Sequence, residues 1–278
     1  MLKVKLFDKK VRDEFFKYAS GITGAITAYI LFWDIPDECK TLAGIICILL
    51  LLGIYAFVWR RANKLTSIDL TVDGTTVTIK AGDIFSQPGL KAIAFNEYFD
   101  TQVDEKIIAS RSLNGIFINK HLNRDLAELD EHIANYRFER EDMIGVNEER
   151  VSGKKQRYQL GTICVWQDYL LTAFARFSEY NEARLTMAEY LTFLINFWDR
   201  VNRVYAMESV SVPIFGSGIT RIKEHRGISD EELLKIMLWT FRVSEMRFSY
   251  PAKLTIVIHQ DKIKKINLFE LQSSKNGL

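Results

Sequence analysis

The stretch from Val212 to Thr220 contains the residue types that suit an anion-binding loop. Its apolar start predicts a strand, and the strand runs into the sequence Gly216-Ser217-Gly218. Glycine lets the backbone approach a ligand closely, and successive backbone N–H groups in such a loop can surround a phosphate. Ligands of α/β sheets bind at the carboxyl ends of strands, which is where this loop falls. A single Gly-Ser-Gly also occurs in ordinary turns, so the loop alone leaves both interpretations open.

Two earlier segments end in polar residues at comparable places. Ile68–Val72 and Thr76–Ile79 alternate apolar and polar residues around Asp73-Gly74, a pattern that predicts a β-hairpin. Gly82-Asp83-Ile84 follows this hairpin, and Ile93-Ala94-Phe95-Asn96 is a short apolar strand candidate that ends in an amide side chain. A carboxylate accepts hydrogen bonds and an amide both donates and accepts them, so both segments can contact a polar ligand.

These three segments, in this order, resemble the macro domain, a fold that binds ADP-ribose. That family has Gly-Asp-Ile after its first hairpin, an apolar strand that ends in Asn, and a much later Pro-x-x-Gly-x-Gly loop, here Pro213 to Gly218. The resemblance implies that Asp83, beside Ile84, accepts a hydrogen bond from the adenine amino group, and that Asn96 lies near the distal ribose. It also implies that the diphosphate is wrapped by the backbone amides of Gly216, Ser217, Gly218, Ile219 and Thr220.

A basic cluster comes directly after this loop and consists of Arg221, Lys223, His225 and Arg226. Such a cluster is either a solvated surface or a charge complement to a diphosphate or a ligand carboxylate. We include Arg221, which is closest to the loop, among the predicted ligand-binding residues.

The sequence departs from catalytic macro domains after Asn96. Those domains commonly continue with a second Asn and a run of glycines, whereas this chain has Glu97-Tyr98-Phe99-Asp100-Thr101 and then Ser110 to Gly115. The departure disfavours removal of ADP-ribose as the activity, so we predict no catalytic residues. Tyr98 and Phe99 either stack on a base or pack in the core.

Other chemistries find no support in the sequence. The four histidines lack the spacing to cysteines that a zinc site needs, so we expect no metal and no cofactor. A formal charge of +2, from 37 basic and 35 acidic residues, excludes nucleic-acid binding driven by bulk charge. Three cysteines in 278 residues exclude a disulfide scaffold.

The apolar residues concentrate in the first 60 positions. Tyr18 to Trp33 and Leu42 to Trp59 contain no charged residue, and Pro36 interrupts helix between them. A membrane-spanning helix needs about 20 mostly apolar residues. We therefore expect residues 1–65 to form a transmembrane hairpin with helices at about 16–35 and 41–60, rather than a signal peptide or a buried helix pair.

The charges around the hairpin predict its orientation. Basic residues flank its outer ends, whereas the connecting loop carries Asp34, Asp37 and Glu38 against Lys40. Positive charges mark the cytoplasmic side, so we expect both termini in the cytoplasm and a multi-pass protein of the bacterial plasma membrane. Ser20, Gly24 and Ala28 recur every four residues, a spacing that favours close helix packing, within the hairpin or between chains.

Residues 66–278 are expected to form one α/β domain with a mixed sheet between helices, a three-layer, macro-like arrangement. Strands are predicted at Tyr158–Trp166, Tyr169–Arg176, Ser209–Ile214 and Lys253–Ile258. Helices are predicted over 122–140 and 186–206, and over 229–247 with a capping box from Ser229 to Glu232. Residues 144–156 are predicted as a loop, and no role is indicated for residues 122–156.

The whole architecture is similar to the membrane effectors of Thoeris-type bacterial anti-phage systems, in which two transmembrane helices precede a macro domain. The resemblance implies a partner with a TIR domain that makes an ADP-ribose-derived signal from NAD. It further implies that the macro domain senses this signal and that the hairpins, acting as a homo-oligomer, disrupt the membrane. Two alternatives remain: a membrane-anchored ADP-ribosyl hydrolase, which the fold resemblance and Asn96 favour, and a passive membrane scaffold.

Overall fold

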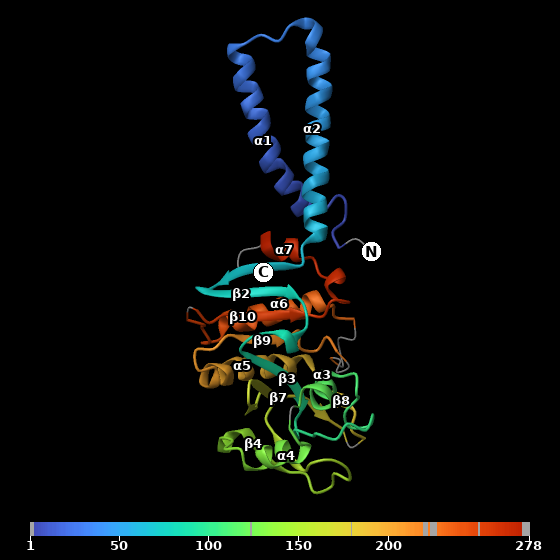
Figure 1. Cartoon of the computed structure of the whole chain (residues 1–278), viewed down its shortest axis with the longest axis vertical. Coiled ribbons are helices and arrows are strands. Elements are labelled where there is room, and N and C mark those ends of the chain that lie inside the picture. The colour runs from blue at the N-terminus through green and yellow to red at the C-terminus, as the bar shows by residue number, and fades with distance from the viewer. Residues whose placement is uncertain are drawn as a thin grey trace.

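The protein consists of a long helical hairpin and an α/β domain (Figure 1). The structure, a computed structural model, describes residues 3–122, 124–178, 180–218, 222, 227–249 and 251–273. Helices α1 (Lys9–Phe32) and α2 (Asp37–Lys64) form the hairpin, which stands away from the domain. Both helices begin before the predicted bounds of 16 and 41. Asp8 caps α1 by accepting a hydrogen bond from the backbone N–H of Lys10 at 2.8 Å, so helix continues through the basic flank.

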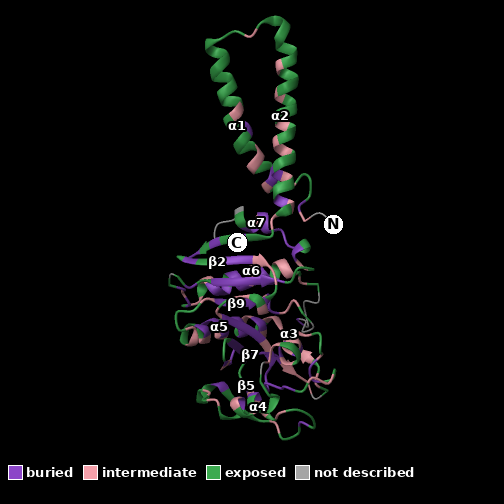
Figure 2. Ribbon diagram, viewed as in Figure 1, coloured by how far each residue is buried: buried purple, intermediate pink, exposed green. Residues whose placement is uncertain are grey.

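The apolar surface of the hairpin is exposed in this chain (Figure 2). In each helix, only 6% of the most apolar 18-residue window is buried, and both helices are long and apolar enough to cross a membrane. A core helix of a soluble domain would instead bury its apolar side chains. The exposure is therefore what a membrane-spanning pair would have, although the structure contains no membrane.

The predicted small-residue stripe of α1 lies on this exposed surface. Ser20, Gly24 and Ala28 are all exposed, and a side chain built on Gly24 would meet no atom within 4 Å. The stripe therefore makes no close contact with α2 in a single chain. Packing of this stripe against another chain stays a prediction.

The base of the hairpin is packed against the domain. Val4, Val11, Val58 and Ala62 form a small apolar cluster that also includes Phe269 of α7 (Leu268–Ser273). The segment before α1 is held by α2, because the indole Nε1 of Trp59 donates to the carbonyl of Val4 at 3.1 Å. The hairpin is thus attached to the domain through side-chain packing as well as through the chain.

The domain is built on an eight-stranded mixed sheet in the order β1-β2-β10-β9-β3-β7-β6, with β8 paired to β7. Strands β2, β10, β9, β3 and β7 run parallel, whereas β1, β6 and β8 are antiparallel to their neighbours. The strand bounds are β1 Ser67–Val72, β2 Thr75–Ala81, β3 Leu90–Asn96, β6 Ile163–Trp166, β7 Tyr169–Phe177, β8 Ala183–Arg184, β9 Val210–Pro213 and β10 Leu254–Ile258. The predicted hairpin around Asp73-Gly74 is β1–β2.

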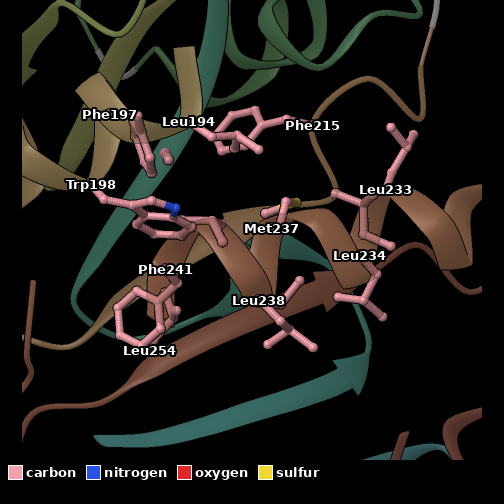
Figure 3. Packing of buried hydrophobic residues seen from close by; sticks show 14 of the residues in the cluster. Leu194, Phe197, Trp198, Phe215, Leu233, Leu234, Met237, Leu238, Phe241 and Leu254 are labelled. Atoms are coloured by element: carbon pink, nitrogen blue, oxygen red, sulfur yellow. The ribbon is translucent and has the colours of Figure 1, made fainter. Parts of the chain in front are cut away.

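Helices cover both faces of the sheet, which confirms the predicted three-layer class. On one face, α5 (Met187–Val204) and α6 (Asp230–Val243) contribute Trp198, Met237 and Phe241 to the main core (Figure 3). On the other face, α3 (Leu113–Ile116), a π-helical turn at Phe117–His121 and α4 (Leu126–Asn135) cover a second cluster. Both α5 and α6 start with capping boxes, at Thr186 and at Ser229 as predicted.

The region between residues 122 and 156 differs from the prediction in detail. The helix predicted over 122–140 is shorter, because α4 ends at Asn135 and a 3₁₀ turn follows at Arg140–Asp142. The predicted loop at 144–156 is flanked by β4 (Met143–Val146) and β5 (Gln156–Tyr158), which pair with each other outside the main sheet. Their glycines and polar residues concealed the pairing in the sequence.

Candidate ligand-binding site

A cavity of about 1180 Å³ lies at the carboxyl ends of the five parallel strands. Each strand supplies a wall: residues 82–85 follow β2, Asn96 ends β3, Phe177 ends β7, residues 213–218 are the end of β9 and the loop after it, and residues 257–262 are the end of β10 and the turn after it. This edge is where parallel α/β sheets bind their ligands, because every strand there ends in a loop that can present backbone and side-chain groups.

The cavity brings together every predicted site residue that the structure describes: Asp83, Ile84, Asn96, Gly216, Ser217 and Gly218. Ile219, Thr220 and Arg221 lie outside the described residues. The sequence interval between the first and last of these segments is more than 130 residues, so their meeting depends entirely on the order of strands in the sheet.

The glycine loop presents unpaired backbone donors. Gly216 has a φ of 81°, a value that glycine adopts without strain, and Ser217 N–H closes a turn onto the carbonyl of Ile214 at 3.3 Å. Within the described part of the chain, the N–H groups of Gly216 and Gly218 have no acceptor. From below, the hydroxyl of Tyr190 supports the loop by donating to the carbonyl of Phe215 at 3.0 Å.

Asp83 lies exposed at the rim of the cavity. Its Oδ1 accepts a hydrogen bond from Phe85 N–H at 3.0 Å and so caps the 3₁₀ turn Ile84–Ser86. The Gly82 N–H donates to the carbonyl of Ile258 at 2.9 Å, which ties this turn to the end of β10. The other carboxylate oxygen has only the hydroxyl of Ser86, at 3.5 Å, and retains capacity to accept from a ligand.

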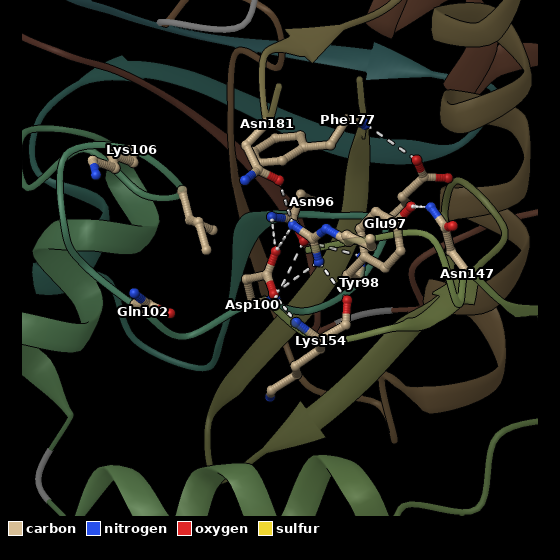
Figure 4. Close-up of polar contacts among 12 residues, drawn as sticks. Asn96, Glu97, Tyr98, Asp100, Gln102, Lys106, Asn147, Lys154, Phe177 and Asn181 are labelled. Carbon is tan, nitrogen blue, oxygen red and sulfur yellow. Dashed lines mark hydrogen bonds and ion pairs between the residues drawn. The ribbon is translucent and has the colours of Figure 1, made fainter. Parts of the chain in front are cut away.

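Asn96 is buried and its amide is engaged inside the protein (Figure 4). Its Oδ1 accepts from the N–H groups of Tyr98 at 3.0 Å and Asp100 at 3.2 Å, and its Nδ2 donates to Asp100 Oδ2 at 2.8 Å. The side chain therefore shapes the turn after β3 while one edge still lines the cavity.

The comparisons with known proteins identify the family. Residues 77–259 match the family model described as Thoeris protein ThsA, Macro domain. The chain belongs to the Thoeris ThsA family. A relative named Thoeris protein ThsA, from Bacillus amyloliquefaciens (strain Y2), is 37% identical over 98% of this chain and 94% of its own length. The family therefore covers the hairpin as well as the macro domain.

Solved macrodomains of Oceanobacillus iheyensis are also similar. One, described with ADP, has a TM-score of 0.46 and 14% identity over 74% of this chain and 94% of its own. A mutant of the same macrodomain, described with ADPR, has a TM-score of 0.46 and 15% identity over 74% of this chain and 96% of its own. Both are far more distant than the ThsA relative.

The ThsA macro domain holds a buried ion pair beside the cavity that sequence reasoning missed. The guanidinium of Arg150 pairs with both carboxylate oxygens of Asp100, lies 3.8 Å from the ring centre of Tyr98, and donates to Asn181 Oδ1 at 2.9 Å. Asn181 and Asn96 both line the cavity. The 147–155 loop, for which no role was predicted, thereby supports the residues that line the cavity.

A second buried carboxylate lies next to Asn96. Glu97 is 1% exposed and its Oε2 accepts from Arg157 at 3.1 Å and Arg176 at 3.2 Å, while its Oε1 accepts from Phe177 N–H at 3.1 Å. These contacts join the ends of β3 and β7. Glu97 is therefore a structural anion.

One wall of the cavity is basic and aromatic. It is the 105–121 segment, which contributes Lys106, Arg111 and Lys120. The ring of His121 stacks on Phe85 with centres 3.8 Å apart and planes 6° apart. With Lys262, four cations line the described part of the cavity beside the carboxylates of Asp83, Glu105, Glu182 and Asp261. The cations and the unpaired N–H groups of the glycine loop can contact an anion. The sequence held no signal for this wall, because its residues have no fixed spacing.

Among the described residues, no group of three or more His, Cys, Asp and Glu side chains is arranged to hold a metal ion.

Proposed function

We propose that this chain is a membrane-anchored effector of a bacterial anti-phage system, whose macro domain senses an ADP-ribose-derived nucleotide. The observation that carries the proposal is the cavity, which the Gly216–Gly218 loop and Asp83 both line. Its volume of about 1180 Å³ exceeds the range of about 300–1,000 Å³ that small-molecule sites usually have, so a dinucleotide-sized ligand fits.

The roles within the site follow from the available groups. The diphosphate binds to the N–H groups of Gly216 and Gly218, with Ile219, Thr220 and Arg221 continuing the loop. The adenine amino group donates to Asp83 beside Ile84, and the distal ribose lies at Asn96. No cofactor is needed, because binding alone carries the signal.

The membrane step follows from the exposed hairpin. We propose that the hairpin crosses the bacterial plasma membrane twice, with both termini in the cytoplasm, where a TIR-domain partner makes the nucleotide from NAD. One hairpin is too narrow to line a pore, so the active form is a homo-oligomer whose hairpins disrupt the bilayer together. A ligand shifts this equilibrium only by its different affinities for the resting and active states.

A hydrolase is the second candidate, and the site disfavours it. The Asn96 amide oxygen already accepts two backbone N–H groups, and its nitrogen donates to Asp100. It is therefore poorly placed to orient a reacting water. Release of ADP-ribose from an ADP-ribosylated protein incubated with the full chain would favour the hydrolase.

Calorimetry on the full chain in lipid nanodiscs tests the sensor. ADP-ribose and the nucleotide products of a TIR-domain reaction are the probes, and GDP is the control. Saturable binding of at least one adenine nucleotide is expected, and an absence of binding for every one of them would refute the proposal.

A further inference from the structure

One continuous segment, residues 257–273, connects the cavity to the hairpin. Its first part, from Val257 to Lys262, lines the cavity. Its last part is α7, which lies directly beneath the hairpin (Figure 1). Because one end of this short segment lines the cavity and the other end contacts the hairpin, a movement of the cavity end can be transmitted through the segment to the hairpin.

At the cavity end, Lys262 holds the glycine loop. Its ammonium donates to the carbonyl of Ser217 and lies 3.7 Å from the carboxylate of Asp230, the first residue of α6. In a trans peptide the C=O and the next N–H point in opposite directions. Holding the Ser217 carbonyl therefore directs the Gly218 N–H away from Lys262, so one anion can contact both the N–H and the ammonium only after this hydrogen bond breaks.

In the middle, the start of α6 is bonded to the start of α7. Glu231 accepts a hydrogen bond from Asn267 N–H at 2.9 Å and pairs with Lys235 at 3.0 Å. Lys235 also pairs with Glu270 of α7 at 3.2 Å. The helix beside Lys262 and the helix beneath the hairpin are thus linked by one hydrogen bond from a backbone N–H and by the ion pair between Lys235 and Glu270.

At the hairpin end, α7 belongs to two cores. Leu268 and Leu271 are buried in the main core of the domain, whereas Phe269 packs with Val58 and Ala62 at the base of the hairpin. A shift of α7 relative to the domain therefore moves Phe269 relative to α2, since packed side chains do not deform independently.

We propose that Lys262 is the positioning residue that couples the cavity to the hairpin through residues 257–273. In the arrangement seen, it ties the glycine loop to α6 and keeps Phe269 docked under α2. A diphosphate in the loop competes with the Ser217 carbonyl and Asp230 for the Lys262 ammonium, which releases α6 and α7 and frees the hairpin. This inference rests on the proposed function for the identity of the ligand, but the contacts themselves are independent of it.

The test is hydrogen–deuterium exchange on the full chain in nanodiscs, comparing Lys262→Met, Lys262→Arg and Lys264→Met. Lys264 is the matched control because it lies two residues away, is exposed, and has no ion-pair partner among the described residues. Lys262→Met is expected to speed exchange across α7 and the 4–11 segment by about fivefold or more, in the range of ordinary coupling energies. Lys262→Arg should restore slow exchange, and Lys264→Met should behave as the parent chain.

The same experiment separates this inference from the proposed function. If Lys262→Met exchanges no faster than Lys264→Met, the coupling is refuted whether or not a nucleotide binds. ADP-ribose added to the parent chain should reproduce the faster exchange. If ADP-ribose binds by calorimetry but does not change hydrogen exchange, the coupling through Lys262 is refuted and the proposed nucleotide sensor is not. If no nucleotide binds but Lys262→Met still speeds exchange, only the proposed sensor is refuted.

Discussion

Arg150 and Asp100 form a buried, two-point ion pair, with Nη1–Oδ1 and Nη2–Oδ2 distances of 3.1 and 2.6 Å. The side chains are 4% and 2% exposed. Asp100 also accepts from Lys154 N–H at 2.7 Å and from Asn96 Nδ2 at 2.8 Å, so three residues donate to one carboxylate. The pair joins the turn after β3 to the 147–155 loop and holds Asn96 in the cavity wall.

Removing one partner of this pair should destabilise the domain strongly. Asp100→Ala leaves a buried guanidinium uncompensated, which typically costs about 3–5 kcal/mol. The double variant Asp100→Ala with Arg150→Met should lose less than the sum of the single changes. Denaturant unfolding in detergent, followed by tryptophan fluorescence, measures both.

The exposed pair of Arg124 and Glu128 is the control for this cycle. Its side chains are 58% and 51% exposed, so Glu128→Ala should cost less than about 1 kcal/mol. Strict additivity of the Asp100 and Arg150 changes would show that the pair contributes no coupling energy.

Two substitutions at Gly218 should distinguish a loss of ligand binding from a loss of folding. A side chain built there meets no atom within 4 Å, and its φ is not in the left-handed region, so Gly218→Ala should fold normally and bind ADP-ribose. Gly218→Asp places a carboxylate where the diphosphate is proposed to lie and should abolish binding by charge repulsion. Melting temperatures should be alike for both variants. Unchanged binding by Gly218→Asp would favour the passive scaffold.

Asp83 should set the preference for adenine. Asp83→Asn keeps an oxygen that can cap the turn at Phe85 but removes the charge that accepts from the adenine amino group. A hydrogen bond to a charged group contributes about 1.5–3 kcal/mol, so affinity for ADP-ribose should fall about tenfold or more. Affinity for the hypoxanthine analogue, which lacks the amino group, should not fall. Equal losses for both ligands would show that Asp83 acts only on the turn.

The native cysteines report the orientation of the hairpin. Cys39 is exposed at the start of α2, on the connecting side of the hairpin, whereas Cys164 is buried in the domain. A membrane-impermeant maleimide should label Cys39 in intact spheroplasts. Labelling that appears only after the membrane is permeabilised would place the connection in the cytoplasm and contradict the proposed orientation.

The buried thiol of Cys164 should make the folded domain less stable at alkaline pH. Burial raises the pKa of its thiol from 9.0 to about 12. The folded state therefore holds this proton more tightly than the unfolded chain, and stability is lost as the pH rises from about 9 toward 12. The thiol should resist alkylation at pH 8 until the domain unfolds. Prompt alkylation of the native chain would contradict its burial.

The sequence predicted the parts of the fold that depend on local pattern. Alternation around Asp73-Gly74 gave β1 and β2, and Ser229 with Glu232 gave the start of α6. Two uncharged runs predicted the hairpin. Both helices start earlier than predicted, because Lys and Arg in the flank of α1 are good helix formers and because Asp37 and Glu38 interact favourably with the dipole in the first turn of α2. The three segments predicted to bind the ligand line one cavity, and they could be recognised because each ends or directly follows a strand.

The rest of the site could not be read from the sequence, because it depends on contacts between distant segments. Arg150 meets Asp100 across 50 positions, and Lys262 meets Ser217 across 45. Phe85 and His121 stack only because the 105–121 segment folds over the end of β2. No spacing rule connects such residues, since their proximity is set by strand order and not by helical or strand periodicity.

Dye release from vesicles that contain the full chain tests directly whether a nucleotide in the cavity controls disruption of the membrane. The vesicles carry the reconstituted protein with the macro domain outside, and the products of a TIR-domain reaction are added. We expect rapid release of dye with the parent chain and with Gly218→Ala, and no release with Gly218→Asp. Release that is absent for every nucleotide, or that is equal with Gly218→Asp, would contradict a membrane effector controlled by a nucleotide in this cavity.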